Sequence, residues 1–99
     1  MNRRELIVTG PTGDPLVAEQ LGALRQDPEG ARERELDVTE REGVAFQVEL
    51  MGKDGGLNAR WDNLVGVAEL WAKIDAMPAR RRQLREAAAA AAAPARIRR

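Results

Sequence analysis

The stretch Val44–Trp61, VAFQVELMGKDGGLNARW, decides the fold of this chain. Its first half alternates apolar and polar residues, which predicts a strand with one apolar face. The inward residues of that strand are expected to be Val44, Phe46, Val48 and Leu50. The glycine-rich segment Gly52–Gly56 supplies positions that tolerate positive φ and is typical of a hairpin turn. A second alternating segment follows, so the stretch is predicted to form a strand, a turn and a returning strand. On the returning strand, Leu57, Ala59 and Trp61 alternate with Asn58 and Arg60.

The segment before the hairpin predicts a strand, a helix and a second strand. The run Glu5–Thr9 is apolar and partly β-branched, which indicates a central strand buried on both faces. Asp14 is a good helix N-cap and Pro15 suits the first helical position. Glu35–Thr39 alternates and is predicted to be a half-buried edge strand, parallel to the first through the helical crossover.

The first helix is expected to present one apolar face, built from Val17, Leu21 and Leu24 with Leu16 beside them. Asp27–Gly30 is expected to close it, and Glu40–Gly43 to be a short polar link into the hairpin. A second long helix is predicted after the hairpin, capped by Asp62 or Asn63 and ended by Pro78. Its apolar face is predicted to contain Leu64, Val67, Trp71 and Ile74, flanked by Leu70 and Met77.

Beyond Pro78 the composition changes, so the sequence predicts a domain over residues 1–78 and an appended arm over residues 79–99. Ala79–Ala93 consists mostly of strong helix formers, with Leu84 as its one large apolar residue, and Pro94 is expected to stop this helix. Residues 79–99 contain seven arginines and one acidic residue, whereas residues 1–78 contain nine basic and fifteen acidic residues. A basic arm is therefore attached to an acidic body.

The chain contains no cysteine, no histidine and no tyrosine. Thiol chemistry and the commonest general base and metal ligand are therefore excluded, and we expect a protein that is not an enzyme and holds no cofactor or metal. No apolar run has the length of a signal-peptide core or a membrane span. We expect a cytoplasmic protein, or one incorporated in a virion assembled in the bacterial cytoplasm.

Two segments carry a resemblance to a known family. These are Val48–Leu57, VELMGKDGGL, and Leu70–Arg82, LWAKIDAMPARRR. The chain over about residues 4–85 resembles the thioredoxin-like domain of unknown function 4174. The resemblance implies a minimal thioredoxin-like β-α-β-β-β-α sheet, in the α/β (α+β) class, to which the arm is appended. Thioredoxins carry redox cysteines between the first strand and first helix, but the matching stretch Gly10–Asp14 has none, so no redox activity is expected. The helix that usually precedes the hairpin is also missing, which predicts one thinly covered sheet face.

Three motifs have simpler interpretations than a binding or catalytic site. In Gly52–Gly56 the lysine precedes an aspartate and a strand, unlike a phosphate-binding P-loop, which favours a plain turn. An anion could bind at the start of the first helix, but the Asp14 cap would occupy that position. The acidic residues between Glu29 and Glu42 are best interpreted as a solvated sheet edge that discourages strand pairing.

Our leading hypothesis is a structural or adaptor subunit of a larger assembly, most concretely a bacteriophage virion component in the head, neck or tail. The arm would dock on an acidic protein surface through Arg80, Arg81, Arg82, Leu84, Arg85, Arg96, Ile97, Arg98 and Arg99. A second hypothesis is a bacterial domain that binds a peptide or an anion on its thinly covered sheet face. A third is nucleic-acid contact through the arm, although the acidic body opposes it. Membrane binding is not expected, because the arm has few large apolar side chains.

Overall fold

The computed structural model describes the backbone of residues 3–97 and the side chains of residues 3–91. Within this range the chain forms four strands and four helices, which confirms the predicted mixed α+β class. In chain order they are β1 (Arg4–Gly10), α1 (Pro15–Arg25), α2 (Pro28–Glu33), β2 (Leu36–Glu42), β3 (Gln47–Met51), β4 (Leu57–Trp61), α3 (Val67–Asp75) and α4 (Pro78–Ile97).

The four strands form one mixed sheet in the order β2-β1-β3-β4. Strand β1 pairs in parallel with β2 and antiparallel with β3, and β3 pairs antiparallel with β4. The prediction of a central first strand is confirmed, since Leu6 and Val8 are fully buried and Ile7 is nearly so. The link from β2 to β3 therefore crosses the end of β1.

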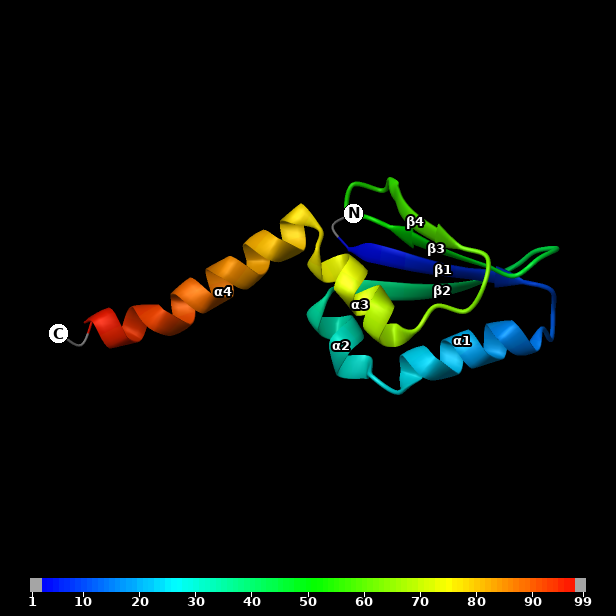
Figure 1. The fold of residues 1–99 in the computed structure, drawn as a ribbon, viewed down its shortest axis with the longest axis horizontal. Helices are drawn as coiled ribbons and strands as arrows, with labels where there is room; N and C mark the ends of the chain where they lie inside the picture. The colour runs from blue at the N-terminus through cyan, green and yellow to red at the C-terminus, as the bar shows by residue number, and fades with distance from the viewer. Residues whose placement is uncertain (1–2, 98–99) are drawn as a thin grey trace.

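Helices α1, α2 and α3 lie on the same side of the sheet (Figure 1). One apolar core joins the inward residues of the strands to the buried faces of α1 and α3. The opposite sheet face carries none of the described helices, which confirms the prediction of thin coverage. This open face is lined by polar and charged residues together with Ile7 and Met51.

Local signals place the first two helices. The Asp14 carboxylate accepts the Leu16 N–H at 2.9 Å and so caps α1, as predicted. Asp27 accepts the Gly30 N–H at 2.9 Å in the same manner. The segment expected only to close α1 therefore also begins α2, because an aspartate followed by proline is a starting signal for a helix.

Two predictions about the hairpin are wrong. Strand β3 begins only at Gln47, and Val44 is 100% exposed rather than inward. Side chains alternate between the two faces of a sheet only within a paired strand. Val44 lies before Gln47, the first residue of β3 that pairs with β1. Glu40–Glu42, expected in the polar link, instead extends β2 along the full length of β1.

The beginning of α3 also differs from the prediction. Neither Asp62 nor Asn63 caps it, because the chain runs through a loop until the N-cap Gly66, which makes no side-chain cap. In this loop Val65 is buried at 3% exposure whereas Leu64 is 37% exposed, so the two exchange their expected places. Leu64 and Val65 precede α3, so the helical period does not determine which of them faces the core.

Helix α4 projects from the body as an arm, and the molecule measures 61 × 26 × 20 Å along its principal axes (Figure 1). It begins at Pro78, where α3 was expected to end. The prediction that Pro94 stops the arm helix is wrong, since α4 continues to Ile97. A proline removes one backbone hydrogen bond and bends a helix, but it does not have to end it.

Candidate functional site: the arm and its anchor

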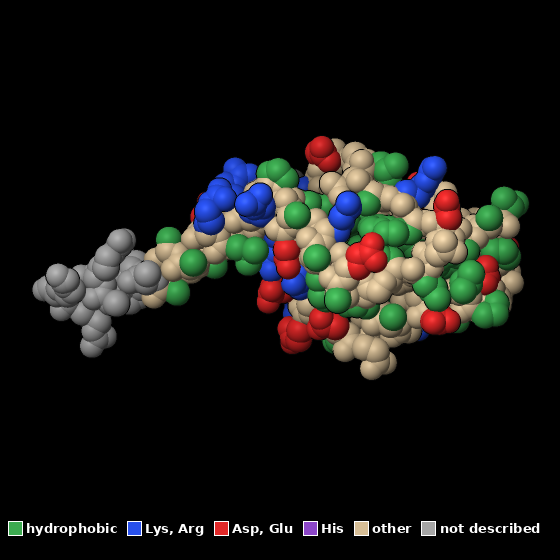
Figure 2. Space-filling view, viewed as in Figure 1, with side chains coloured by type: hydrophobic (Ala, Val, Ile, Leu, Met, Phe, Trp, Pro, Cys, Tyr) green, Lys and Arg blue, Asp and Glu red, His purple; other side chains and the backbone are tan. Residues whose placement is uncertain are grey.

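The exposed part of the arm is a basic helix face. Successive helical residues are rotated by about 100°, which places Arg81, Arg82 and Arg85 on neighbouring lines and Arg80 and Leu84 on the opposite side. The first three are exposed, and every described side chain from Leu84 to Ala91 is exposed as well. Figure 2 shows Lys and Arg side chains gathered over the first turns of α4, above an acidic part of the body.

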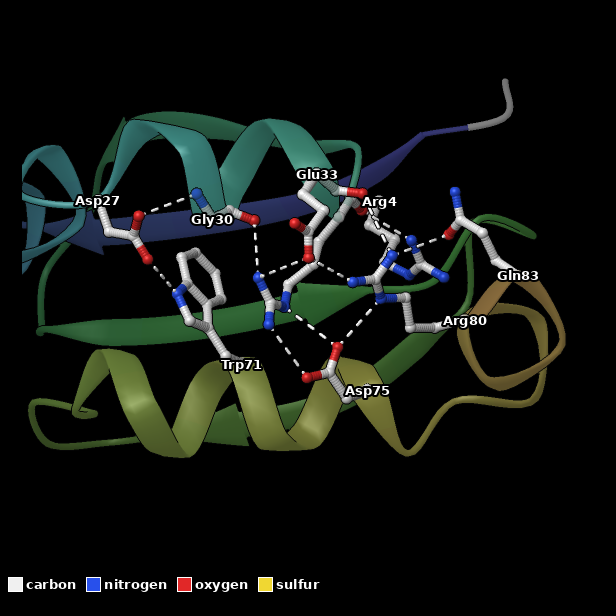
Figure 3. Close-up of polar contacts among 9 residues, drawn as sticks. Arg4, Asp27, Gly30, Glu33, Trp71, Asp75, Arg80 and Gln83 are labelled. Atoms are coloured by element: carbon white, nitrogen blue, oxygen red, sulfur yellow. Dashed lines mark hydrogen bonds and ion pairs between the residues drawn. The ribbon is translucent and has the colours of Figure 1, made fainter. Parts of the chain in front are cut away.

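Arg80 has a different environment from the other arginines of the arm. Its side chain is 4% exposed, and its Nε donates to the Asp75 carboxylate at 3.0 Å (Figure 3). Its Nη2 donates to Glu33 at 2.8 Å, and its Nη1 donates to Gln83 at 3.2 Å. The guanidinium is thus used within the chain, and we leave Arg80 out of the surface offered to a partner. The side of the first turn of α4 that carries Arg80 is therefore attached to the body.

A second, largely buried arginine completes the base of the arm. Arg34, just after α2, donates to both Asp75 oxygens at 3.1 and 3.0 Å. Its guanidinium also lies 5.0 Å from the centre of the Trp71 ring, a cation–π geometry. We call Glu33, Arg34, Asp75 and Arg80 the arm anchor, because they join α2, α3 and α4.

Asp75 is the shared acceptor of the arm anchor. Desolvation raises the pKa of its carboxyl, but hydrogen bonds from Arg34 and Arg80 outweigh that effect, so the pKa lies below its ordinary value of 3.8. The charged form is therefore the one that the fold favours. The charged carboxylate joins Arg34 to Arg80 and so ties the start of α4 to the body.

Trp71 extends the network to the start of α2. Its indole N–H donates to Asp27 at 2.8 Å, and Asp27 also caps α2 through Gly30 (Figure 3). The hydrogen bond from Trp71, followed by that from Gly30, lowers the pKa of Asp27. The sequence pattern predicted Trp71 only as a core residue. A buried indole N–H needs an acceptor, and this requirement could have indicated a polar partner for Trp71.

The acidic residues between Glu29 and Glu42 are mostly engaged with neighbouring side chains. Most of them contact a basic or hydroxyl side chain: Glu29 pairs with Arg32, Glu33 with Arg80, Glu35 with Lys53, Asp37 with Arg3, and Glu42 with Thr12. Within residues 3–97, no three acidic side chains gather to hold a metal ion. The acidic stretch stabilises the edge strand and the anchor.

The remaining predicted contact residues lie beyond the described side chains. Arg96 and Ile97 fall within α4, but their side chains are outside the described range, and Arg98 and Arg99 are outside it altogether. None of the helices over residues 3–97 is long and apolar enough to cross a membrane.

No family model, curated protein or solved structure matches this chain. The resemblance to the thioredoxin-like domain of unknown function 4174 therefore remains a prediction that rests on the segments quoted for it.

Proposed function

We propose that this chain is a non-enzymatic structural or adaptor subunit that joins a larger protein assembly through α4, with a bacteriophage particle as the most concrete version. The observation that carries the proposal is the contrast between the two ends of the arm. Its base is held by ion pairs of the buried Arg80 with Glu33 and Asp75, whereas the side chains from Leu84 to Ala91 are exposed. Most helices in proteins owe their stability to packing of one face, so a fixed, uncovered helix suits contact with another chain.

The charge of the arm points to an acidic partner. Arg81 and Arg85 are four residues apart on one helix face, and like charges at this spacing repel one another. Carboxylates from a partner would relieve that repulsion through charge-assisted, bidentate hydrogen bonds. The alanines that follow would let a second helix approach closely, because their side chains are small.

The body cannot supply these carboxylates itself. The body acids at the base of the arm, Glu33 and Asp75, already accept hydrogen bonds from Arg80 and Arg34. The basic face of α4 also lies opposite the side that carries Arg80. An external protein surface is therefore the best source of counter-charge.

A truncation that tests this role has to keep the anchor. A cut after Pro78 removes Arg80, whereas a chain that ends at Glu86 keeps both Arg80 and Gln83. We expect residues 1–86 to remain folded and to enter the assembly less than the full chain when both are expressed in the native source, because Arg81 and Arg85 are kept but the helix surface from Ala87 onward is lost. For a virion subunit, the full chain should co-sediment with purified particles at a fixed ratio.

Charge reversal gives a sharper version of the same test. Arg81→Glu with Arg85→Glu should abolish incorporation at unchanged stability, while Arg60→Glu, an exposed change on β4, should not. Incorporation that is insensitive to the reversed arm would overturn the proposal and favour a contact elsewhere on the body.

Nucleic-acid contact is the second candidate, and the same exposed arginines favour it. Three phosphate contacts predict a logarithmic salt slope of about −2.7 for duplex DNA. Fluorescence anisotropy with a labelled duplex between 50 and 200 mM salt measures this slope. A slope of that size that disappears in the doubly reversed variant would replace the protein partner with nucleic acid.

A further inference from the structure

Arg4 is a buried cation with an incomplete set of partners. It begins β1, and its side chain lies beside the start of α4 (Figure 3) with 1% of the residue exposed. Its Nη1 donates to the backbone oxygen of Arg34 at 2.7 Å, and its Nε lies 3.3 Å from the Met77 sulfur, a weak acceptor. Its Nη2 is buried and is the only side-chain nitrogen or oxygen in the described part of the chain that is buried without a hydrogen-bond partner.

The carboxylates around Arg4 are bonded to other cations. Glu35 and Asp75 are the acids that act on Arg4 through space. Glu35 accepts from Lys53 at 2.6 Å, and Asp75 accepts from the two arginines of the arm anchor. Four cations (Arg4, Arg34, Lys53 and Arg80) thus share three acids (Glu33, Glu35 and Asp75). One positive charge is left without an acid, and a buried charge of this kind is costly unless a counter-charge reaches it.

A cavity lies against this unpaired charge. Its volume is about 350 Å³, and it opens between the β3–β4 turn and the first turn of α4. We call it the hairpin pocket, and it is lined by Arg4, Gly52, Lys53, Asp54, Asn58, Met77, Pro78, Ala79 and Arg82. Three of these side chains are cationic. Asp54 is the one acid among them, and its Oδ1 accepts the Gly56 N–H at 2.9 Å within the turn.

We propose that the hairpin pocket binds a small oxyanion, a phosphate or carboxylate group, which supplies the counter-charge that Arg4 lacks. Lys53 and Arg82 would contact the anion at the mouth of the pocket, and the Nη2 of Arg4 would donate to it from the buried end. Because this nitrogen is buried, a neighbouring side chain has to move before an anion can reach it. The site shares Arg82 with the basic face of the arm, but Arg81 and Arg85, on which the assembly test rests, do not line it.

The test is an NMR titration of the full ¹⁵N-labelled chain with sodium phosphate and with sodium acetate, each against sodium chloride at equal ionic strength. We expect saturable shifts of the Gly52 and Lys53 amides and of the Arg4 guanidinium with at least one oxyanion. Arg4→Met should abolish them, and Arg82→Met should weaken binding about tenfold, the loss typical of one charge-assisted contact. The neighbouring Arg81→Met, outside the pocket, should change affinity less than twofold.

The two anions separate the sources of the ligand. Tighter phosphate binding supports free phosphate or a phosphorylated compound, and tighter acetate binding supports a carboxylate presented by a protein. Equal shifts with chloride, or no shift with either oxyanion, would overturn the proposal. If Arg4→Met does not fold, the wild-type guanidinium signals and the contrast between Arg82→Met and Arg81→Met still decide the result.

Discussion

Replacement of Arg80 by methionine should release the arm from the body. Methionine keeps the length of the buried stem but removes the guanidinium, which donates to Asp75 and Glu33 at 3.0 and 2.8 Å. The loss of a whole buried partner can cost 3–5 kcal/mol when it leaves an uncompensated charge. Here the cost is smaller, because Asp75 keeps its two hydrogen bonds from Arg34.

The two lost contacts contribute unequally to the free energy of unfolding. Glu33 is 64% exposed, so water replaces the arginine and that contact is worth at most about 1 kcal/mol. Asp75 is 35% exposed, which places its charged hydrogen bond at the low end of the usual range, about 1.5 kcal/mol. We therefore expect Arg80→Met to lower the free energy of unfolding by about 2 kcal/mol, which corresponds to a fall in Tm of roughly 10 °C for a domain of this size.

Urea unfolding and spin-label distances measure the two consequences. Because the chain has no cysteine, two introduced cysteines at exposed positions 60 and 88 can be labelled selectively. The distance distribution between body and arm should be narrow in the parent and broad in Arg80→Met, while the exposed control Arg85→Met should leave it narrow. A stability loss below about 0.5 kcal/mol with an unchanged distribution would refute the role assigned to the anchor.

Three further predictions concern the body. Gly30→Ala should destabilise the fold by about 1–3 kcal/mol, because the new Cβ would lie 2.7 Å from the Trp71 indole nitrogen. Gly22→Ala should instead stabilise α1 by up to about 1 kcal/mol, because nothing lies within 4 Å of the new Cβ. Urea unfolding measures both changes. Since the folded-state pKa of Asp75 lies below 3.8, its stabilising effect is present above that pH and is lost as the pH falls through the folded-state value. The free energy of unfolding should thus decline less steeply below about pH 4 in Asp75→Asn than in the parent, and equal slopes would contradict this assignment. Gln20→Leu should cost about 2 kcal/mol in the same assay, because the buried amide both donates to and accepts from the backbone of one loop residue at 3.0 Å.

The sequence predicted the elements whose signals are local. Asp14 followed by Pro15 marks the start of α1 because both effects act within the first turn. The apolar run of β1 marks a central strand because burial on both faces leaves no polar position. In contrast, the loop before α3 has no period of its own, and only the tertiary core determines that Val65 is buried and Leu64 is not.

The arm anchor could not be predicted in this way. Arg34 and Asp75 are 41 residues apart, and Arg80 and Glu33 are 47 apart, so their pairing depends on the complete fold. From the sequence alone, each of these residues would be interpreted as a solvent-exposed charge. One buried polar group is indicated by the sequence. Gln20 occupies the i+3 position of the apolar face that begins at Val17, and an amide on such a face needs buried hydrogen-bond partners.

The contrast between an acidic body and a basic arm acquires a sharper meaning in the structure. Opposite net charges could draw the two parts together along their length, but among the described side chains of the arm only Arg80, at its base, forms ion pairs with the body. The next exposed arginines, from Arg81 to Arg85, face away from acids that are already paired. Folding thus uses the first basic residue of the arm to fix the direction of α4 and leaves the others without a described counter-charge. For this reason we place the partner's acidic surface against the outer face of α4. The open sheet face is a poorer candidate, because its exposed charges are of both signs.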